Sequence, residues 1–248
     1  MNTPADWIIP EWPAPHRVKA LITTRLGGFS QGLYAGFNLG DHVGDEALAV
    51  RQNRDLLRKY LPAEPKWLKQ VHGSQVANAD ILRALQEADA SVARKANTLC
   101  AILSADCLPL LLCDENGSVV ASAHCGWRGL AAGVIEQTVS AMRAAPATLL
   151  AYLGPAISPK VYEVGADVHE TFLHGDAGAQ QAFAPRAPGK WLADLYLLAR
   201  QRLNCLGVKN IHGGNFCTYT EAGRFFSHRR DGNTGRMASL IWLDTKSG

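Results

Sequence analysis

The 248-residue sequence contains no C-x-x-C pair, no H-x-H pair and no apolar run near the ~20 residues of a membrane-spanning helix. The absence of paired cysteines argues against a disulfide scaffold and against a zinc-finger clip. The H-x-H pairs that build a trinuclear copper cluster are missing, and the 3 methionines, at positions 1, 142 and 237, lie away from the candidate ligands described below. A copper oxidase of the usual kind is therefore disfavoured.

Charge of either sign is also scarce, since 19% of the residues are charged and the net charge is +3. A nucleic-acid-binding protein usually carries a dense basic face, so nucleic acid is not expected as a partner. The first residues lack a basic start followed by an apolar stretch, and the six cysteines are read as reduced thiols. We therefore expect a cytoplasmic protein with no membrane association.

Hydrophobic residues make up 47% of the chain, enough for a large core. Apolar patterning predicts strands and helices in a mixed order without a strict βαβ rhythm, which favours an α/β (α+β) fold of mixed β-sheets with helices packed outside, in a single domain covering residues 1–248. We expect a long glycine-rich loop at 26–45. The predicted strands are 17–25, 66–72, 98–103, 108–113, 118–124, 147–154, 208–212 and 236–243, and the predicted helices are 45–61, 127–145 and 193–207.

Two polar residues interrupt the apolar stripe of the 45–61 helix, Asn53 and Arg54. A buried arginine is costly unless it is paired. Arg54 is either a structural ion pair or a contact to an anionic substrate, and we predict the second.

Three further residues share one local context, a reactive side chain at the end of an apolar strand-like run. Cys107 follows Asp106 ahead of "LPLLLC", His124 ends "VVASAH" before the turn "GWRG", and His72 precedes Gly73 in "KQVHGSQV". Two histidines and one cysteine form a plausible three-ligand set for zinc, with a fourth position open to water or substrate. The separations of 35 and 17 residues are far too long for a local clip, so the fold has to assemble this site.

The start of the helix after "GWRG" would offer free backbone N–H groups to an anion, and Arg128 adds a cation there. Asp106 and Glu163 are candidates for a general base. Asp106 could instead turn the chain or orient a neighbour of the ligands.

Several longer motifs, in order along the chain from about residue 20 to the C-terminus, resemble the laccase-domain family. These are "TTRLGGFSQGLYAGFNLGDHVGD", "KQVHGSQV", "ADCLPLLL", "AHCGWRGLAAGV", "LGPAISPKVYEVG" and "FFSHRRDGNTGRMASLIWL". Cys125 departs from the alanine that the family usually has, and His228 stands where tyrosine is common. Neither departure removes a ligand, and Cys125 should point away from His124 because side chains alternate along a strand.

The resemblance implies a purine nucleoside phosphorylase with adenosine deaminase and methylthioadenosine phosphorylase activity, in a single laccase-domain-like catalytic domain. It implies zinc, or possibly copper, on His72, Cys107 and His124, which would also be the catalytic residues. Purine nucleosides and phosphate are the implied partners. We predict Asn38, Arg54 and Arg128 as substrate-binding residues. The oligomeric state, monomer or homodimer, is left open.

Three alternatives stay open at this level. The first is a copper-dependent polyphenol oxidase, the older label of the family. The second is a metal-free hydrolase in which Cys107 is the nucleophile and a histidine is its base, including editing of peptidoglycan precursors. The third is a structural zinc site, which normally has four protein ligands, whereas no fourth Cys or His has the same context. The arginines of "FFSHRRDGNTGR", Arg229, Arg230 and Arg236, are weaker candidates for contact with a nucleobase.

Overall fold

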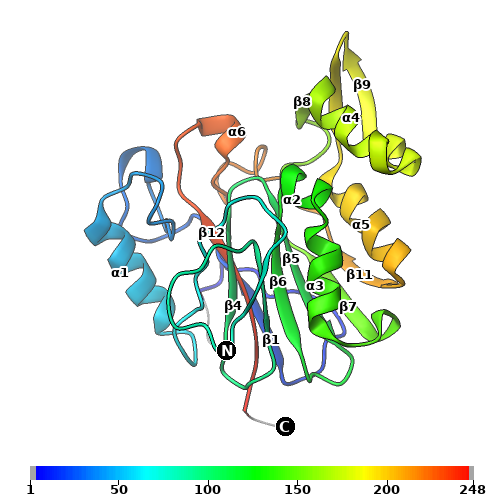
Figure 1. Cartoon of the computed structure of the whole chain (residues 1–248). Helices are drawn as coiled ribbons and strands as arrows, with labels where there is room; N and C mark the ends of the chain where they lie inside the picture. Colours follow the sequence, from blue (N-terminus) through cyan, green and yellow to red (C-terminus); the bar gives the residue numbers. More distant parts are fainter. Residues whose placement is uncertain (1–3, 246–248) are drawn as a thin grey trace.

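In the computed structural model, which describes residues 4–245, three β-sheets are covered by helices (Figure 1). The outermost residues of the expected 1–248 domain lie outside that range. The predicted fold class, mixed sheets with helices packed outside, is confirmed. No helix among residues 4–245 is both long and apolar enough to cross a membrane.

The central sheet has six strands in the order β11-β7-β5-β6-β3-β2. The β11–β7 and β2–β3 pairs are parallel and the remaining pairs are antiparallel. Its strands are β2 (Val76–Asn78), β3 (Ala90–Ala93), β5 (Leu108–Asp114), β6 (Val120–Cys125), β7 (Leu149–Leu153) and β11 (Asn210–Gly213).

A second sheet of three antiparallel strands packs against one face of the central sheet. Its order is β1 (Val18–Ile22), β12 (Met237–Leu243), β4 (Cys100–Ser104). A third small sheet, β8 (Glu163–Gly165), β10 (Lys190–Ala193) and β9 (Phe183–Ala187), stands at the periphery beside α4 (Ala166–Gly175) (Figure 1).

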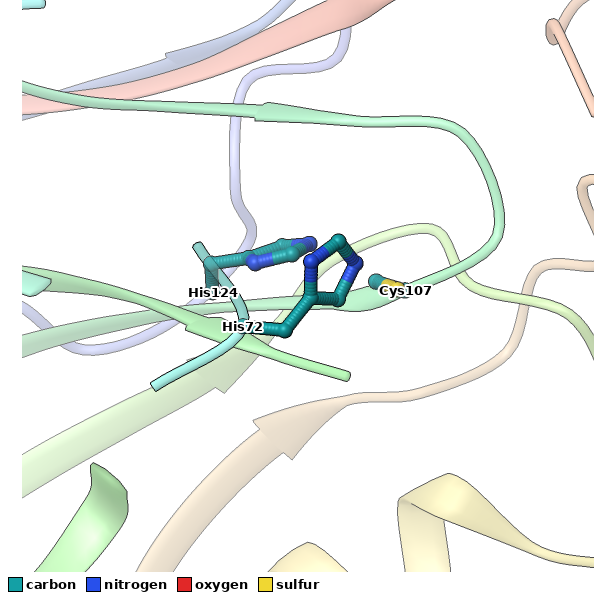
Figure 2. Close-up of side chains that lie close together, drawn as sticks. All are labelled: His72, Cys107 and His124. Carbon is teal, nitrogen blue, oxygen red and sulfur yellow. The ribbon is translucent and has the colours of Figure 1, made fainter. Parts of the chain in front are cut away.

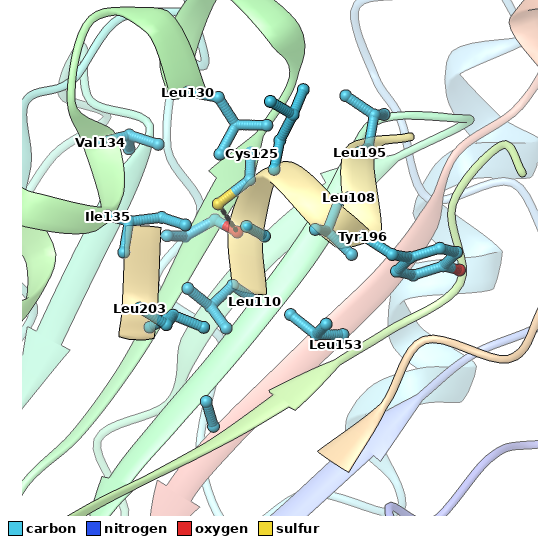
Figure 3. Packing of buried hydrophobic residues seen from close by; sticks show 14 of the residues in the cluster. Leu108, Leu110, Cys125, Leu130, Val134, Ile135, Leu153, Leu195, Tyr196 and Leu203 are labelled. Atoms are coloured by element: carbon cyan, nitrogen blue, oxygen red, sulfur yellow. Dashed lines mark hydrogen bonds between the residues drawn. The ribbon is translucent and has the colours of Figure 1, made fainter. Parts of the chain in front are cut away.

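Successive side chains of β5 point alternately to the helices and to the second sheet. Leu108, Leu110 and Leu112 belong to a core shared with helices, whereas Leu111 and Cys113 belong to the core between the two larger sheets. Both faces of this strand are buried, which explains its continuous apolar sequence. Figure 3 shows the helix side, where Leu108 and Leu110 face Leu130, Ile135 and Leu203.

The helices cover the two outer faces. The helices α2 (Trp127–Ala131), α3 (Val134–Met142) and α5 (Leu195–Leu206) pack on the central sheet. Helix α1 (Ala47–Arg58) packs on the second sheet, formed by β1, β12 and β4. The result is a helix–sheet–sheet–helix sandwich. A short α6 (His228–Asp231) precedes β12, and 3-10 turns lie at Gly32–Tyr34, Pro146–Thr148 and Ala177–Ala182.

Two predicted elements are wrong in detail. The helix expected at 127–145 is divided because Gly133 adopts a left-handed φ of 85°, so α2 has only five residues. The strand expected at 66–72 forms only isolated bridges at Lys66 and Lys69, because the amides of Val71 and His72 bond to a side chain instead of a strand. The sequence reading also missed β2, β3, α4 and the small peripheral sheet.

Candidate metal centre

The three predicted ligands, His72, Cys107 and His124, come together in space (Figure 2). Their ligand atoms lie within 4.8 Å of one another, and the two imidazole rings meet edge to face at 4.9 Å between centroids. His124 stands near the end of β6, Cys107 directly precedes β5, and His72 lies in the loop before β2. Because β5 and β6 are antiparallel neighbours, with Leu108 opposite Cys125, the last residues of β6 lie beside the residues that begin β5.

Asp89, a residue that the sequence analysis did not single out, holds this group together. Its fully buried carboxylate accepts from the backbone N–H of Val71, His72 and Gly73 at 2.8–3.0 Å, and it lies 2.9 Å from Nδ1 of His124. One side chain therefore fixes two of the three ligands. In the sequence, Asp89 is only an acidic residue directly before the short strand β3. That pattern is too common to indicate a functional site.

The Asp89 contact also selects the tautomer of His124. A carboxylate opposite Nδ1 requires that this nitrogen carries the proton, which leaves Nε2 as a ligand atom. Burial opposes ionisation of Asp89, but the hydrogen bonds from His124 and the loop amides outweigh it and lower the pKa of the carboxyl.

Without a metal, Cys107 and His124 each favour the charged form of the other. Burial raises the pKa of the Cys107 thiol, but the positive charge of His124 and hydrogen bonds from both histidines outweigh it and lower that pKa to about 6. Burial disfavours the imidazolium of His124, yet the thiolate and Asp89 raise its pKa to about 9. The thiolate is the form of cysteine that binds metals.

The donor set fits a single metal ion. One thiolate and two imidazoles, about as far apart as bonds of about 2.0–2.3 Å to one ion allow, are ligands that zinc prefers. Gly126 leaves the space that this grouping needs, because a Cβ there would stand 2.8 Å from Sγ of Cys107. Cys125 lies in the core against the helices, as alternation predicts, and takes no part (Figure 3).

A cavity of about 310 Å³ opens beside His72 and Cys107. Its volume lies at the lower end of the range of roughly 300–1,000 Å³ that is usual for small-molecule sites. Arg128, a predicted substrate-binding residue, lines this cavity with its guanidinium 4.4 Å from the Trp127 ring centroid. The other lining residues are Ala105, Asp106, Ile157, Tyr162, Leu195, His228 and Arg229.

The two candidates for a general base differ in position. Asp106 lines the cavity, but its carboxylate accepts from the hydroxyl of Thr218 and the backbone N–H of Arg229, at 2.5 and 2.6 Å. Its backbone φ of 93° turns the chain ahead of Cys107. Glu163 is exposed on β8 and does not line the cavity.

Asn38 and Arg54 lie elsewhere. The amide of the fully buried Asn38 is bonded to Gly40, Asp45 and the backbone N–H of Arg236. Arg54 donates two hydrogen bonds to the carbonyl of Leu39, forms an ion pair with Asp41 at 3.0 Å and stacks on the ring of Trp67. It lines a separate cavity of about 610 Å³.

The arginines near the C-terminus also differ. Arg229 lines the metal-centre cavity, lies over the ring of Tyr162 and donates to the carbonyl of Glu163. Arg230 is bonded to Asp231 and to backbone carbonyls, and Arg236 donates to the carbonyls of Thr234 and Gly235. Of the three, Arg229 therefore has the best access to a ligand.

The chain also resembles known proteins along nearly its whole length. Residues 19–244 match the family described as multi-copper polyphenol oxidoreductase laccase. Purine nucleoside phosphorylases of Pseudomonas aeruginosa and Escherichia coli are 51% and 50% identical, covering 96% and 95% of this chain and 98% of each relative. The crystal structure of Neisseria meningitidis protein NMB0706 has a TM-score of 0.94 at 51% identity, covering 96% of this chain and 99% of that one. The Bacillus licheniformis hypothetical protein YfiH has a TM-score of 0.85 at 31% identity, covering 92% and 93%.

Proposed function

Since this chain belongs to the family described as multi-copper polyphenol oxidoreductase laccase, with relatives named purine nucleoside phosphorylases, we propose that it is a zinc-dependent purine nucleoside phosphorylase. The observation that carries the proposal is the His72–Cys107–His124 group at the wall of a 310 Å³ cavity that also holds Arg128. Adenosine or inosine would be cleaved by phosphate to free base and ribose 1-phosphate. Deamination of adenosine and phosphorolysis of methylthioadenosine are the further activities that we propose to test.

Each residue has a part in this proposal. His72, Cys107 and His124 hold the ion, and Asp89 orients His124 and the loop of His72. When bound, a zinc ion with an open position supplies a Lewis acid and lowers the pKa of bound water to about 7. Arg128 and Arg229 offer positive charge to phosphate in the same cavity. The side chain of Arg128 carries this role better than the helix dipole does, because α2 has only five residues.

Copper is the alternative that the family description favours. Two histidines and a thiolate also suit copper, and blue-copper sites add a weak axial methionine. Met142 is the last residue of α3 and is buried in the core between the helices and the central sheet, and the sulfur of Met237 accepts from the backbone N–H of Phe226, so neither serves as that ligand. A polyphenol oxidase would consume oxygen with phenols and would be indifferent to phosphate.

Cysteine hydrolysis is a second candidate with a specific observation behind it. Asp89, His124 and Cys107 stand in the order of a nucleophile triad, with the carboxylate at Nδ1 and a thiol of lowered pKa beyond the ring. Such a triad has no need of His72, which nevertheless lies with its ligand atom inside the same group. A hydrolase of this kind, including one that edits peptidoglycan precursors, would survive chelators and lose activity on alkylation.

One experiment separates these readings. Zinc-loaded and copper-loaded protein is assayed with and without phosphate for free purine base, ammonia and oxygen uptake. Base release that requires both zinc and phosphate is the expected result. Oxygen uptake with phenols alone, or turnover that persists after chelation, would contradict the proposal.

A substitution tests the ligand assignment. Cys107→Ala should remove most bound zinc and all activity, with the fold intact by circular dichroism. Cys205→Ala is the matched control, because Cys205 is exposed on α5, is not part of the group and does not line the cavity. Full zinc retention in Cys107→Ala would show that the group is not the metal site.

Arg54 and Asn38 remain proposed substrate contacts, although their polar groups already have partners within the protein. Arg54→Met keeps the length and much of the volume of the side chain. Turnover at the wild-type level across a phosphate titration would leave Arg54 with only its contacts to Leu39, Asp41 and Trp67.

We also propose that the protein is cytoplasmic. All six cysteines are free, which suits a reducing compartment.

A further inference from the structure

The cavity beside the metal centre needs a proton acceptor, and most of its polar groups are already committed. In phosphorolysis by hydrogen phosphate, the proton of the phosphate ends on the released purine. One group could therefore accept the proton from phosphate and then donate it to the purine. Asp106 is occupied by Thr218 and Arg229. Burial raises the pKa of Tyr162, which therefore keeps its proton.

His228 is the remaining candidate among the described residues that line the cavity. Its Nδ1 lies 2.7 Å from the carbonyl oxygen of Gly232. A carbonyl oxygen can only accept, so Nδ1 carries the proton and Nε2 is left with a free lone pair. The tautomer is thus set for proton acceptance at Nε2.

The position of His228 is also fixed. It is the first residue of α6, where Oγ of Ser227 accepts from the backbone N–H of Arg230 and the N–H of Gly232 closes on the carbonyl of His228. The next residue, Arg229, donates its backbone N–H to Asp106, the neighbour of Cys107. The short helix is therefore docked directly onto the segment that carries a metal ligand.

We propose that His228 is the proton carrier of the phosphorolysis, an inference that rests on the proposed function. Nε2 takes the proton of hydrogen phosphate as the phosphate oxygen bonds to C1′ of the ribose. The bond from C1′ to the purine nitrogen breaks, and its electron pair leaves with the purine. The imidazolium then gives the proton to the purine, which restores the neutral ring.

Two substitutions separate this role from a structural one. In His228→Asn the amide nitrogen can replace Nδ1 as the donor to Gly232, so α6 is preserved while Nε2 is lost. In His228→Ala the ring is removed, and added imidazole can enter the space. His212→Asn is the control, because His212 lies on β11, does not line the cavity and has its Nε2 bonded to Asn210.

We expect His228→Asn to lower kcat for phosphate-dependent base release on the order of 10²-fold, the lower end of the usual contribution of a general base, with unchanged zinc content. Imidazole should restore part of the activity of His228→Ala in proportion to its concentration and should not affect His228→Asn. His212→Asn should match the wild type.

The outcomes divide cleanly. A kcat for His228→Asn within about threefold of the wild type, or the absence of rescue in His228→Ala, would overturn the role of His228 and leave the proposed function standing. A wild-type protein that releases no base with phosphate would overturn the proposed function, and the proton carrier with it.

Discussion

At the scale of single residues, the candidate metal centre depends on the residues around the three proposed ligands as much as on the ligands themselves. Cys107, His72 and His124 could be predicted because each stands beside an apolar run and within a recognisable motif. The role of Asp89 could not be predicted, because it exists only where three segments meet: the one that carries Asp89, the strand end at His124 and the loop whose three amides bond to Asp89. Nothing local in "EADASVAR" distinguishes it from a surface acid.

Asp89→Asn should weaken zinc binding by 10- to 100-fold, the usual cost of losing the partner of a metal-bound histidine. Asparagine has a single side-chain oxygen, and its NH2 group can only donate, so the loop of His72 and the ring of His124 would lose part of their support. Competition with a chromogenic chelator measures the affinity. Asp80→Asn is the matched control, since Asp80 also accepts from two backbone amides, those of Arg94 and Lys95, but lies outside the group. Equal affinities in the two variants would contradict this role.

Gly126→Ala should lower the zinc content without unfolding the protein. The backbone φ of −68° suits alanine, so the change acts through the new methyl group alone. That methyl would stand 2.8 Å from Sγ of Cys107 and 3.3 Å from Cδ2 of His72, and relief requires a ligand to move. Metal analysis after gel filtration gives the readout. Gly223→Ala, where a Cβ meets nothing within 4 Å, should keep the wild-type content.

At the scale of elements, strands and helices with strong apolar patterns could be predicted from the sequence. The prediction is wrong where a side chain forms hydrogen bonds with backbone amides that a strand would otherwise use. The segments of β4, β5, β6, β7 and β12 were foreseen because both faces of these strands are buried. The segment at 66–72 looks like a strand, but the backbone N–H groups of Val71 and His72 donate to the carboxylate of Asp89 instead of to a neighbouring strand. The small sheet of β8, β9 and β10 was missed because β9 is largely exposed and contains Pro185.

The glycine-rich loop at 26–45 was foreseen as a long loop, and α1 explains how it is held. Asn53 projects from the buried face of α1, where Oδ1 accepts from the backbone N–H of Phe29 and Nδ2 donates to Oγ of Ser30 and the carbonyl of Asn38. The polar residue in the apolar stripe is therefore the attachment point of the loop.

Asn53→Ala should destabilise the protein by about 2–3 kcal/mol, because it leaves buried donors and acceptors without partners. Urea unfolding followed by circular dichroism measures the loss, and proteolysis should begin in the loop. Gln52→Ala, an exposed position on the same helix, is expected to change stability by less than about 0.5 kcal/mol. A similar effect of both substitutions would refute the role of Asn53 as the attachment point.

At the scale of the whole molecule, the last strand of the chain pairs with the first. The last strand, β12, lies between β1 from the beginning of the chain and β4 from the middle (Figure 1). All seven of its residues are buried. Neither half of the chain can complete this sheet alone.

A chain that ends before Met237 should therefore fail to fold, since β1 and β4 would lose their shared neighbour. A chain that ends at Asp244 keeps the whole of β12 and should unfold in urea like the full-length protein. The comparison uses circular dichroism and hydrogen exchange. A cooperative unfolding transition in the shorter chain would show that the two larger sheets are independent.

The wide spacing of the ligands along the chain has a thermodynamic consequence. Since 35 and 17 residues separate His72, Cys107 and His124, the unfolded polypeptide presents them as scattered, weak ligands, and only the finished fold offers all three to one ion. The affinity for the ion is then also a contribution to the conformational equilibrium. Free zinc at 100 times its dissociation constant would add about 2.7 kcal/mol to the unfolding free energy. The melting temperature of this protein should accordingly rise with the logarithm of zinc concentration, which would make calorimetry a measure of metal affinity that needs no substrate.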